Sequence, residues 1–104
     1  MLIKYPRGTT FLWPLARANY ENGSLATAVD VYISLRRLLA VEPGNYYNLI
    51  ECDFLMARCY QDYDDTEKLR LAARAACEYL DLIPPDVRRR QRDKIAFLRR
   101  TAGI

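Results

Sequence analysis

Residues 12–20, LWPLARANY, and residues 53–61, DFLMARCYQ, are two versions of one segment. When Arg17 is aligned with Arg58, an aromatic residue falls on an aromatic residue and an alanine on an alanine. Internal repetition of this kind indicates that a chain is assembled from related structural units. We therefore interpret the sequence as being organised around one helix that is used twice.

The bulk composition predicts one globular domain. The chain has 104 residues, of which 51% are apolar and 28% are charged, an ordinary balance for a folded protein. A chain of this size supports one modest core. Its longest apolar runs are far shorter than a membrane span, and its first residues lack the apolar segment of a signal peptide.

The absence of histidine narrows the chemistry that the chain can perform. Histidine is the commonest acid–base group near neutral pH and a frequent zinc ligand, and the sequence contains none. It also has no glycine-rich phosphate loop. Asp62, Asp64 and Asp65 lack the spacing of a calcium loop, so capping of a helix explains them better. We expect a protein that is not an enzyme and that uses no metal or cofactor.

Three cysteines, Cys52, Cys59 and Cys77, leave at least one thiol unpaired. On a helix, Cys52 and Cys59 would lie ~10 Å apart, too far for a disulfide. We expect buried thiols in a reducing compartment, either the cytoplasm or an organellar matrix.

The periodicity of apolar residues predicts an all-α fold. Thr10 is a candidate N-cap of the first helix, Pro14 should lie in its first turn, and Gly23 should end it. We expect an N-terminal arm over residues 1–9, a single domain over residues 10–100 and a frayed end over residues 101–104. The expected helices cover residues 10–22, 25–41, 46–61, 67–82 and 85–100.

The pattern of small residues, aromatic residues and prolines resembles the tetratricopeptide repeat. One unit contains Leu15, Ala16, Tyr20, Gly23, Ala28, Tyr32, Leu35 and Pro43, and a second contains Ala57, Tyr60, Ala73, Cys77, Leu80 and Pro85. The family period is 34 residues, whereas equivalent positions here lie 41 to 45 residues apart. The resemblance implies two degenerate antiparallel helix pairs followed by a C-terminal capping helix.

The same resemblance implies that the first helix of each pair lines a concave groove. The residues facing that groove would be Trp13, Arg17 and Tyr20 from one unit and Phe54, Arg58 and Gln61 from the next. Their aromatic rings would supply apolar contact area, and their arginines would bind carboxylates of a partner helix or peptide. The alternative is structural: each arginine lies across its own aromatic neighbour in a cation–π contact. The family's Lys and Asn carboxylate clamp is not reproduced.

A second candidate surface is the basic segment near the C-terminus. Residues 86–104 carry seven Lys or Arg and two Asp, whereas the preceding 85 residues are slightly acidic. The basic patch comprises Arg88, Arg89, Arg90 and Arg92. It is explained either as the solvated face of a capping helix or as a contact with RNA, an acidic protein or an anionic lipid surface.

We therefore predict a protein–protein interaction adaptor or accessory subunit of a larger complex. It would bind its partner through the groove and the basic C-terminal helix. The alternative function is an RNA-binding accessory protein that uses the arginine cluster. A third possibility, an adaptor recruited to a membrane, is less well supported because no C-terminal anchor follows Leu98.

Overall fold

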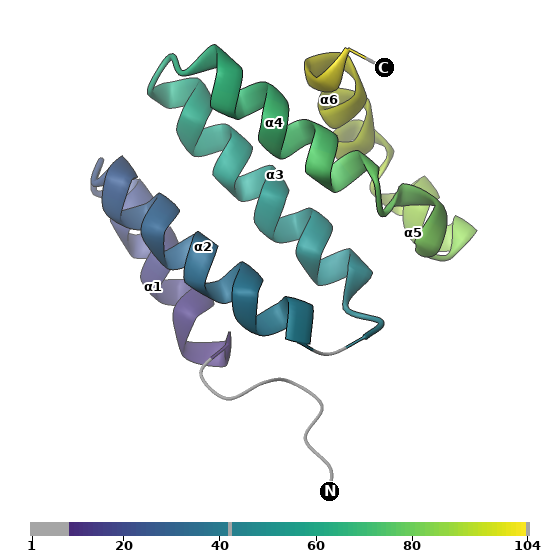
Figure 1. Cartoon of the computed structure of the whole chain (residues 1–104), viewed down its shortest axis with the longest axis horizontal. Helices are drawn as coiled ribbons and strands as arrows, with labels where there is room; N and C mark the ends of the chain where they lie inside the picture. The colour runs from purple at the N-terminus through teal and green to yellow at the C-terminus, as the bar shows by residue number, and fades with distance from the viewer. Residues whose placement is uncertain (1–8, 42, 104) are drawn as a thin grey trace, which may run out of the picture.

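A computed structural model describes residues 9–41 and 43–103, and the part of the chain that it describes is all-α. Most of the predicted arm, residues 1–8, lies outside the described residues. Each of the first three helices packs against the next one, and the last helix packs against the fourth (Figure 1). The elements are α1 (Thr9–Glu21), α2 (Leu25–Val41), α3 (Tyr46–Asp62), α4 (Thr66–Cys77), the 3₁₀ turn η1 (Leu80–Leu82), α5 (Pro85–Arg90) and α6 (Arg92–Ala102).

The predicted start of the first helix was wrong by one residue. Helix α1 begins at Thr9, which is buried, so Thr10 lies within its first turn. Pro14 is consequently in the second turn and not the first. Because proline lacks an N–H, the Thr10 carbonyl has no helical donor there.

The predicted end of the first helix is confirmed, whereas the predicted end of the fourth helix is wrong. Gly23 adopts a φ of +81° just after α1, and the Ser24 N–H donates to the Asn19 carbonyl, as in a Schellman cap. Asp65 caps α4 by accepting from the Lys68 N–H at 3.1 Å. The predicted helix over residues 67–82 instead ends at Cys77 and is followed by η1. After η1, Pro84 favours the extended conformation of Ile83.

The fifth predicted helix is in fact two helices. Helices α5 and α6 meet at Gln91, whose φ of −107° and ψ of 21° interrupt the helical path. The change of direction lets α6 pack along α4 (Figure 1). Helix α6 reaches Ala102, which is 1% exposed, so the folded part extends beyond residue 100 into the end predicted to fray.

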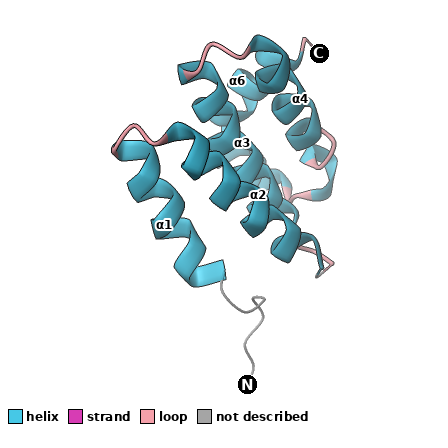
Figure 2. Ribbon diagram, turned by 60° about the vertical axis from the view of Figure 1, so that its left-hand side comes forward, coloured by secondary structure: helices cyan, strands magenta, loops and turns pink. Residues whose placement is uncertain are grey.

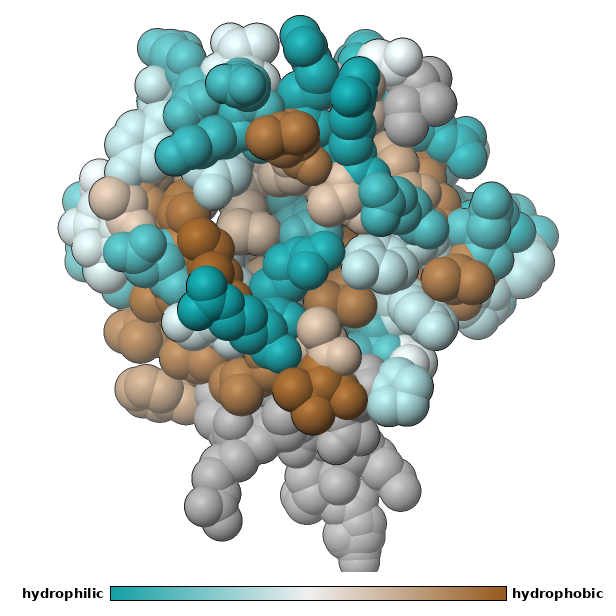
Figure 3. All heavy atoms as spheres, viewed as in Figure 1, coloured by the Kyte–Doolittle hydropathy of each residue, from teal (hydrophilic) through white to brown (hydrophobic). Residues whose placement is uncertain are grey.

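The core has two clusters, and α3 contributes to both. The first joins α1, α2 and α3 around the fully buried Leu35 and Leu39, and the second joins α3, α4 and α6 around Leu98. Burying each of these side chains stabilises the fold by about 1.5–3 kcal/mol. Ala16 and Ala57, the alanines that align in the two repeated segments, are fully buried. In Figure 3, apolar side chains gather on the side where α1 and α2 lie.

A buried ion pair joins α2 to α3. The Arg36 Nε donates to Asp53 Oδ1 at 2.6 Å, and Arg36 Nη2 donates to Asp53 Oδ2 at 3.1 Å. Burial raises the pKa of the Asp53 carboxyl above its usual range, and the bonds from Arg36 oppose that effect. The sequence pattern did not predict this contact, because it depends on how α2 packs against α3.

Candidate functional site

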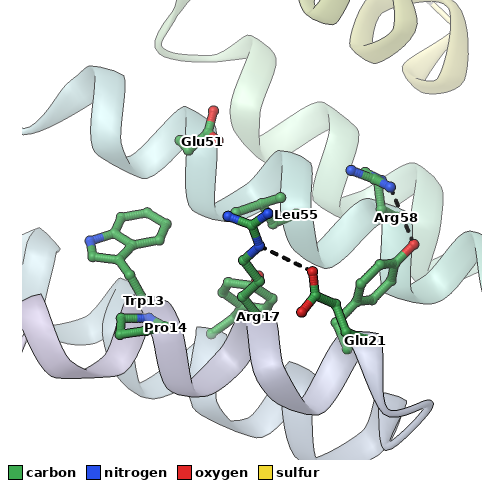
Figure 4. A pocket seen from close by; sticks show the side chains of 9 residues that line it. Trp13, Pro14, Arg17, Glu21, Glu51, Leu55 and Arg58 are labelled. Atoms are coloured by element: carbon green, nitrogen blue, oxygen red, sulfur yellow. Dashed lines mark hydrogen bonds and ion pairs between the residues drawn. The ribbon is translucent and has the colours of Figure 1, made fainter.

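A cavity of about 600 Å³ lies between α1 and α3 (Figure 4). Trp13 and Arg17 reach into it from α1, Leu55 and Arg58 from α3, and Tyr32 from α2. Of the six groove residues predicted from the sequence, four line this cavity. The full lining is Trp13, Pro14, Arg17, Tyr20, Glu21, Tyr32, Glu51, Leu55 and Arg58.

Tyr20 connects the two sides of this cavity near the C-terminal ends of α1 and α3. Its hydroxyl donates to Asp62 Oδ2 at 2.8 Å. The Arg58 guanidinium lies 5.3 Å from the centre of the Tyr20 ring, and its Nη2 donates to the Tyr20 hydroxyl at 3.4 Å. The hydrogen bond to Asp62 is the main cause of a raised pKa at Tyr20. These contacts bridge one end of the cavity.

Trp13 and Arg17 lie apart from this bridge on the same helix. Trp13 is half-buried and packs against the first core cluster. The Arg17 Nε donates to Glu21 at 3.3 Å, but both side chains are more than 60% exposed. An exposed pair of this kind contributes little to stability, so a partner's carboxylate can replace Glu21 at low cost.

A second cavity, of about 320 Å³, adjoins the first along α3 and lies between α3 and α6. Phe54, Gln61 and Arg58 line it from α3. Phe97 and Lys94 face them from α6. Phe54 and Gln61 therefore do not share the first cavity with Trp13, and Arg58 is the predicted residue common to both.

The aromatic–arginine pairing differs from the one considered in the sequence. Arg58 lies over Tyr20 of α1 and not over Phe54, its neighbour on the same helix. Phe54 packs edge-to-face on Phe97, with ring centres 5.6 Å apart, and the Lys94 ammonium lies 4.9 Å from its centre. Lys94 also forms an ion pair with Glu51. Residue spacing alone did not reveal these contacts, because they depend on where α6 packs.

The predicted basic patch is divided by the break at Gln91. Arg88 lies 3.5 Å from Asp81, and Arg90 lies 3.7 Å from Asp86. Arg89 and Arg92 are exposed, and within residues 9–41 and 43–103 neither makes an ion pair. Arg88, Arg89 and Arg90 thus lie on α5, and Arg92 begins α6.

The three thiols differ in their surroundings. Cys52 and Cys59 are fully buried as predicted, and burial raises the pKa of Cys59 to about 11. The Cys52 thiol donates to the Tyr32 carbonyl at 3.2 Å. Cys77 is only partly buried, which differs from the expectation for all three.

No family model matches the sequence, and searches of curated proteins and of solved structures found no match. Across the described residues, no helix is long and apolar enough to cross a membrane. Nor do three or more potential metal ligands come together anywhere in that part of the chain. The functional interpretation therefore depends on the geometry of the two cavities.

Proposed function

We propose that this chain is a small helical-repeat adaptor or accessory subunit that binds a protein partner across α1, α3 and α6. The similarity of residues 10–100 to the tetratricopeptide repeat is part of the proposal. The observation that supports it best is that the two cavities adjoin along α3 and share Arg58. No carboxylate within the described residues forms an ion pair with Arg58.

The chemistry of the two cavities favours a partner segment with a carboxylate between two apolar side chains. Trp13 and Leu55 offer apolar contact in the first cavity, and Phe54 and Phe97 offer it in the second. Arg58 lies between them and can bind a carboxylate through two parallel hydrogen bonds. Aromatic residues and arginine are the side chains on which binding energy usually concentrates.

The test is recovery of the native partner by variants of the tagged, full-length chain. Arg58→Ala should reduce the amount of co-purified partner at least about tenfold, and Trp13→Ala should do so as well. Arg37→Ala is the matched control because Arg37 is exposed on α2, away from both cavities. Quantitative mass spectrometry measures recovery, and circular dichroism checks that each variant keeps its helicity. Wild-type recovery by both cavity variants would contradict the proposal.

Phe54→Ala is a less suitable variant for this test. Phe54 contacts Phe97, so its removal also weakens the packing of α6 on α3. A loss of binding in Phe54→Ala would not distinguish a lost contact with the partner from a displaced α6. The RNA-binding alternative is tested by Arg89→Gln with Arg92→Gln, which should abolish RNA retention only if the alternative is correct.

A further inference from the structure

Helix α1 carries an apolar stripe on the side facing away from α2. Phe11, Pro14, Leu15 and Ala18 occupy positions i, i+3, i+4 and i+7, which lie on one face of a helix. All four are exposed, Phe11 by 67% and Leu15 by 36%. The opposite face holds the buried Ala16. None of the four stripe residues is charged, and α1 lies at the edge of the molecule (Figure 2).

The helix at the other end of the chain has a different outer surface. The exposed residues of α6 include Arg92, Asp93, Arg99 and Arg100. Terminal helices of stacked helical proteins generally need a polar outer face to stay soluble. Helix α6 meets that requirement and the stripe of α1 does not, which points to an occupant of the α1 stripe.

We propose that the occupant is a second copy of this chain, bound through an antiparallel α1–α1 contact. The stripe is complementary to itself. In an antiparallel pair centred between residues 14 and 15, Phe11 faces the second copy's Ala18, and Pro14 faces the second copy's Leu15. A large side chain therefore meets a small one at both ends of the contact, as an isologous two-fold interface requires.

The charges on α1 are also compatible with a second copy. Arg17 and Glu21, the charged residues of α1, lie beside the stripe and neutralise each other as an i, i+4 pair. Two identical stripes can meet without bringing an unbalanced charge into contact. An uncharged stripe does not select a basic or an acidic partner. The sizes of its side chains, however, are complementary to those of the same stripe in antiparallel orientation.

The expected dimer is weak and reversible. Helix α1 has 13 residues and is roughly 20 Å long. A contact between two such helices buries less than the roughly 800 Å² per partner that is usual in stable complexes. We expect a dissociation constant of about 10–500 μM. Pro14 also lines the first cavity, so the stripe borders the cavity-facing side of α1, whereas Phe11, Leu15 and Ala18 line neither cavity. Self-association is measured without any partner, so this proposal does not depend on the proposed function.

Sedimentation equilibrium of the full-length chain, from about 5 to about 500 μM, tests for the dimer. The wild type should show concentration-dependent dimerisation, and Leu15→Glu should weaken it at least about tenfold. Leu71→Glu is the matched control, because Leu71 is an exposed leucine, 57% exposed, on α4. It should dimerise like the wild type. A chain that stays monomeric throughout, or dimerisation unaffected by Leu15→Glu, would overturn the proposal.

A size exchange tests the antiparallel register. Ala18→Phe alone should weaken dimerisation, because it places a phenylalanine opposite Phe11 of the second copy. The double variant Phe11→Ala with Ala18→Phe should restore it, since the large and small residues merely change places. A non-specific apolar patch would instead associate more strongly in Ala18→Phe, and that result would overturn the register. Circular dichroism confirms that the variants remain helical.

Discussion

Asp53 places a carboxylate in the contact between α2 and α3, where its side chain is only 1% exposed. Its two hydrogen bonds to Arg36 compensate for the lost hydration. Arg36 is about 29% exposed, so the aspartate is the partner that depends more on the pair. Removing Arg36 should therefore lower the free energy of unfolding by more than its partial exposure alone would suggest.

We expect Arg36→Met to lower the free energy of unfolding by roughly 2–4 kcal/mol at neutral pH. Without Arg36, the already raised pKa of Asp53 should rise further. The folded chain then binds a proton at a higher pH than the unfolded chain does. The variant should therefore regain stability as the pH falls from 7 toward 4, and more than the wild type does.

Urea titrations across this pH range measure the effect. Arg37→Met is the control, because Arg37 is the neighbouring residue on α2 and is exposed. It should change stability by no more than about 0.5 kcal/mol at any pH. An Arg36→Met variant that loses no stability at neutral pH would contradict the importance assigned to the pair.

Helix α5 has the fewest stabilising features among the helices described. It has six residues, none of them buried, and its last turn contains three arginines. By contrast, α4 buries Ala72, Ala73 and Ala76, although it also carries exposed arginines. Local opening should consequently be easiest between Pro85 and Gln91.

Limited digestion with trypsin should therefore cut first after Arg88, Arg89, Arg90 or Arg92. The exposed Arg70 and Arg74 of α4 serve as internal controls and should be cut later. Mass spectrometry of the earliest fragments identifies the sites. Early cleavage within α4 would show that exposure of an arginine, and not the stability of its helix, determines the order.

The sequence predicted the helices whose ends carry local signals and missed the features set by packing. Gly23 and Asp65 mark helix ends by their own chemistry, and both were located correctly. The break at Gln91 has no glycine or proline to announce it. Beyond it, Ile95 and Leu98 pack into the second core cluster, and such packing is a property of the folded chain and not of the segment.

The same distinction holds for the candidate site. Trp13, Arg17, Tyr20 and Arg58 could be placed near one another because they recur at equivalent positions on two helices. The contributions of Lys94 and Phe97 to the second cavity could not be predicted, because they depend on the direction of α6 after Gln91. The contact between Arg58 and Tyr20 likewise could not be predicted without knowing the distance between α1 and α3.

At the scale of the whole molecule, the core is sensitive to high pH. Burial raises the pKa of Tyr32 to about 12 and that of Cys59 to about 11, and it also raises the pKa of Cys52. Each group stays neutral in the folded chain at a pH where the unfolded chain would ionise it. Ionisation therefore lowers the free energy of the unfolded chain first, and folding stability must fall as the pH rises.

We expect the free energy of unfolding to be constant up to about pH 8 and to decrease steadily from about pH 9 to pH 12. Cys59→Ala should reduce the part of the decrease that begins near pH 9. Replacing the partly buried Cys77 by alanine should affect it less. Chemical denaturation at fixed pH values measures both. A stability that does not change above pH 9 would contradict the burial of these groups.

The bridge of Tyr20 to Asp62 and Arg58 closes one end of the space between α1 and α3. The Trp13 end has no such cross-connection among the residues that line it (Figure 4). A polypeptide lying along the first cavity would therefore meet a barrier in one direction only. Such a site would distinguish the two ends of a bound polypeptide. The direction of that polypeptide would then be determined by the shape of the cavity and not by recognition of its side chains.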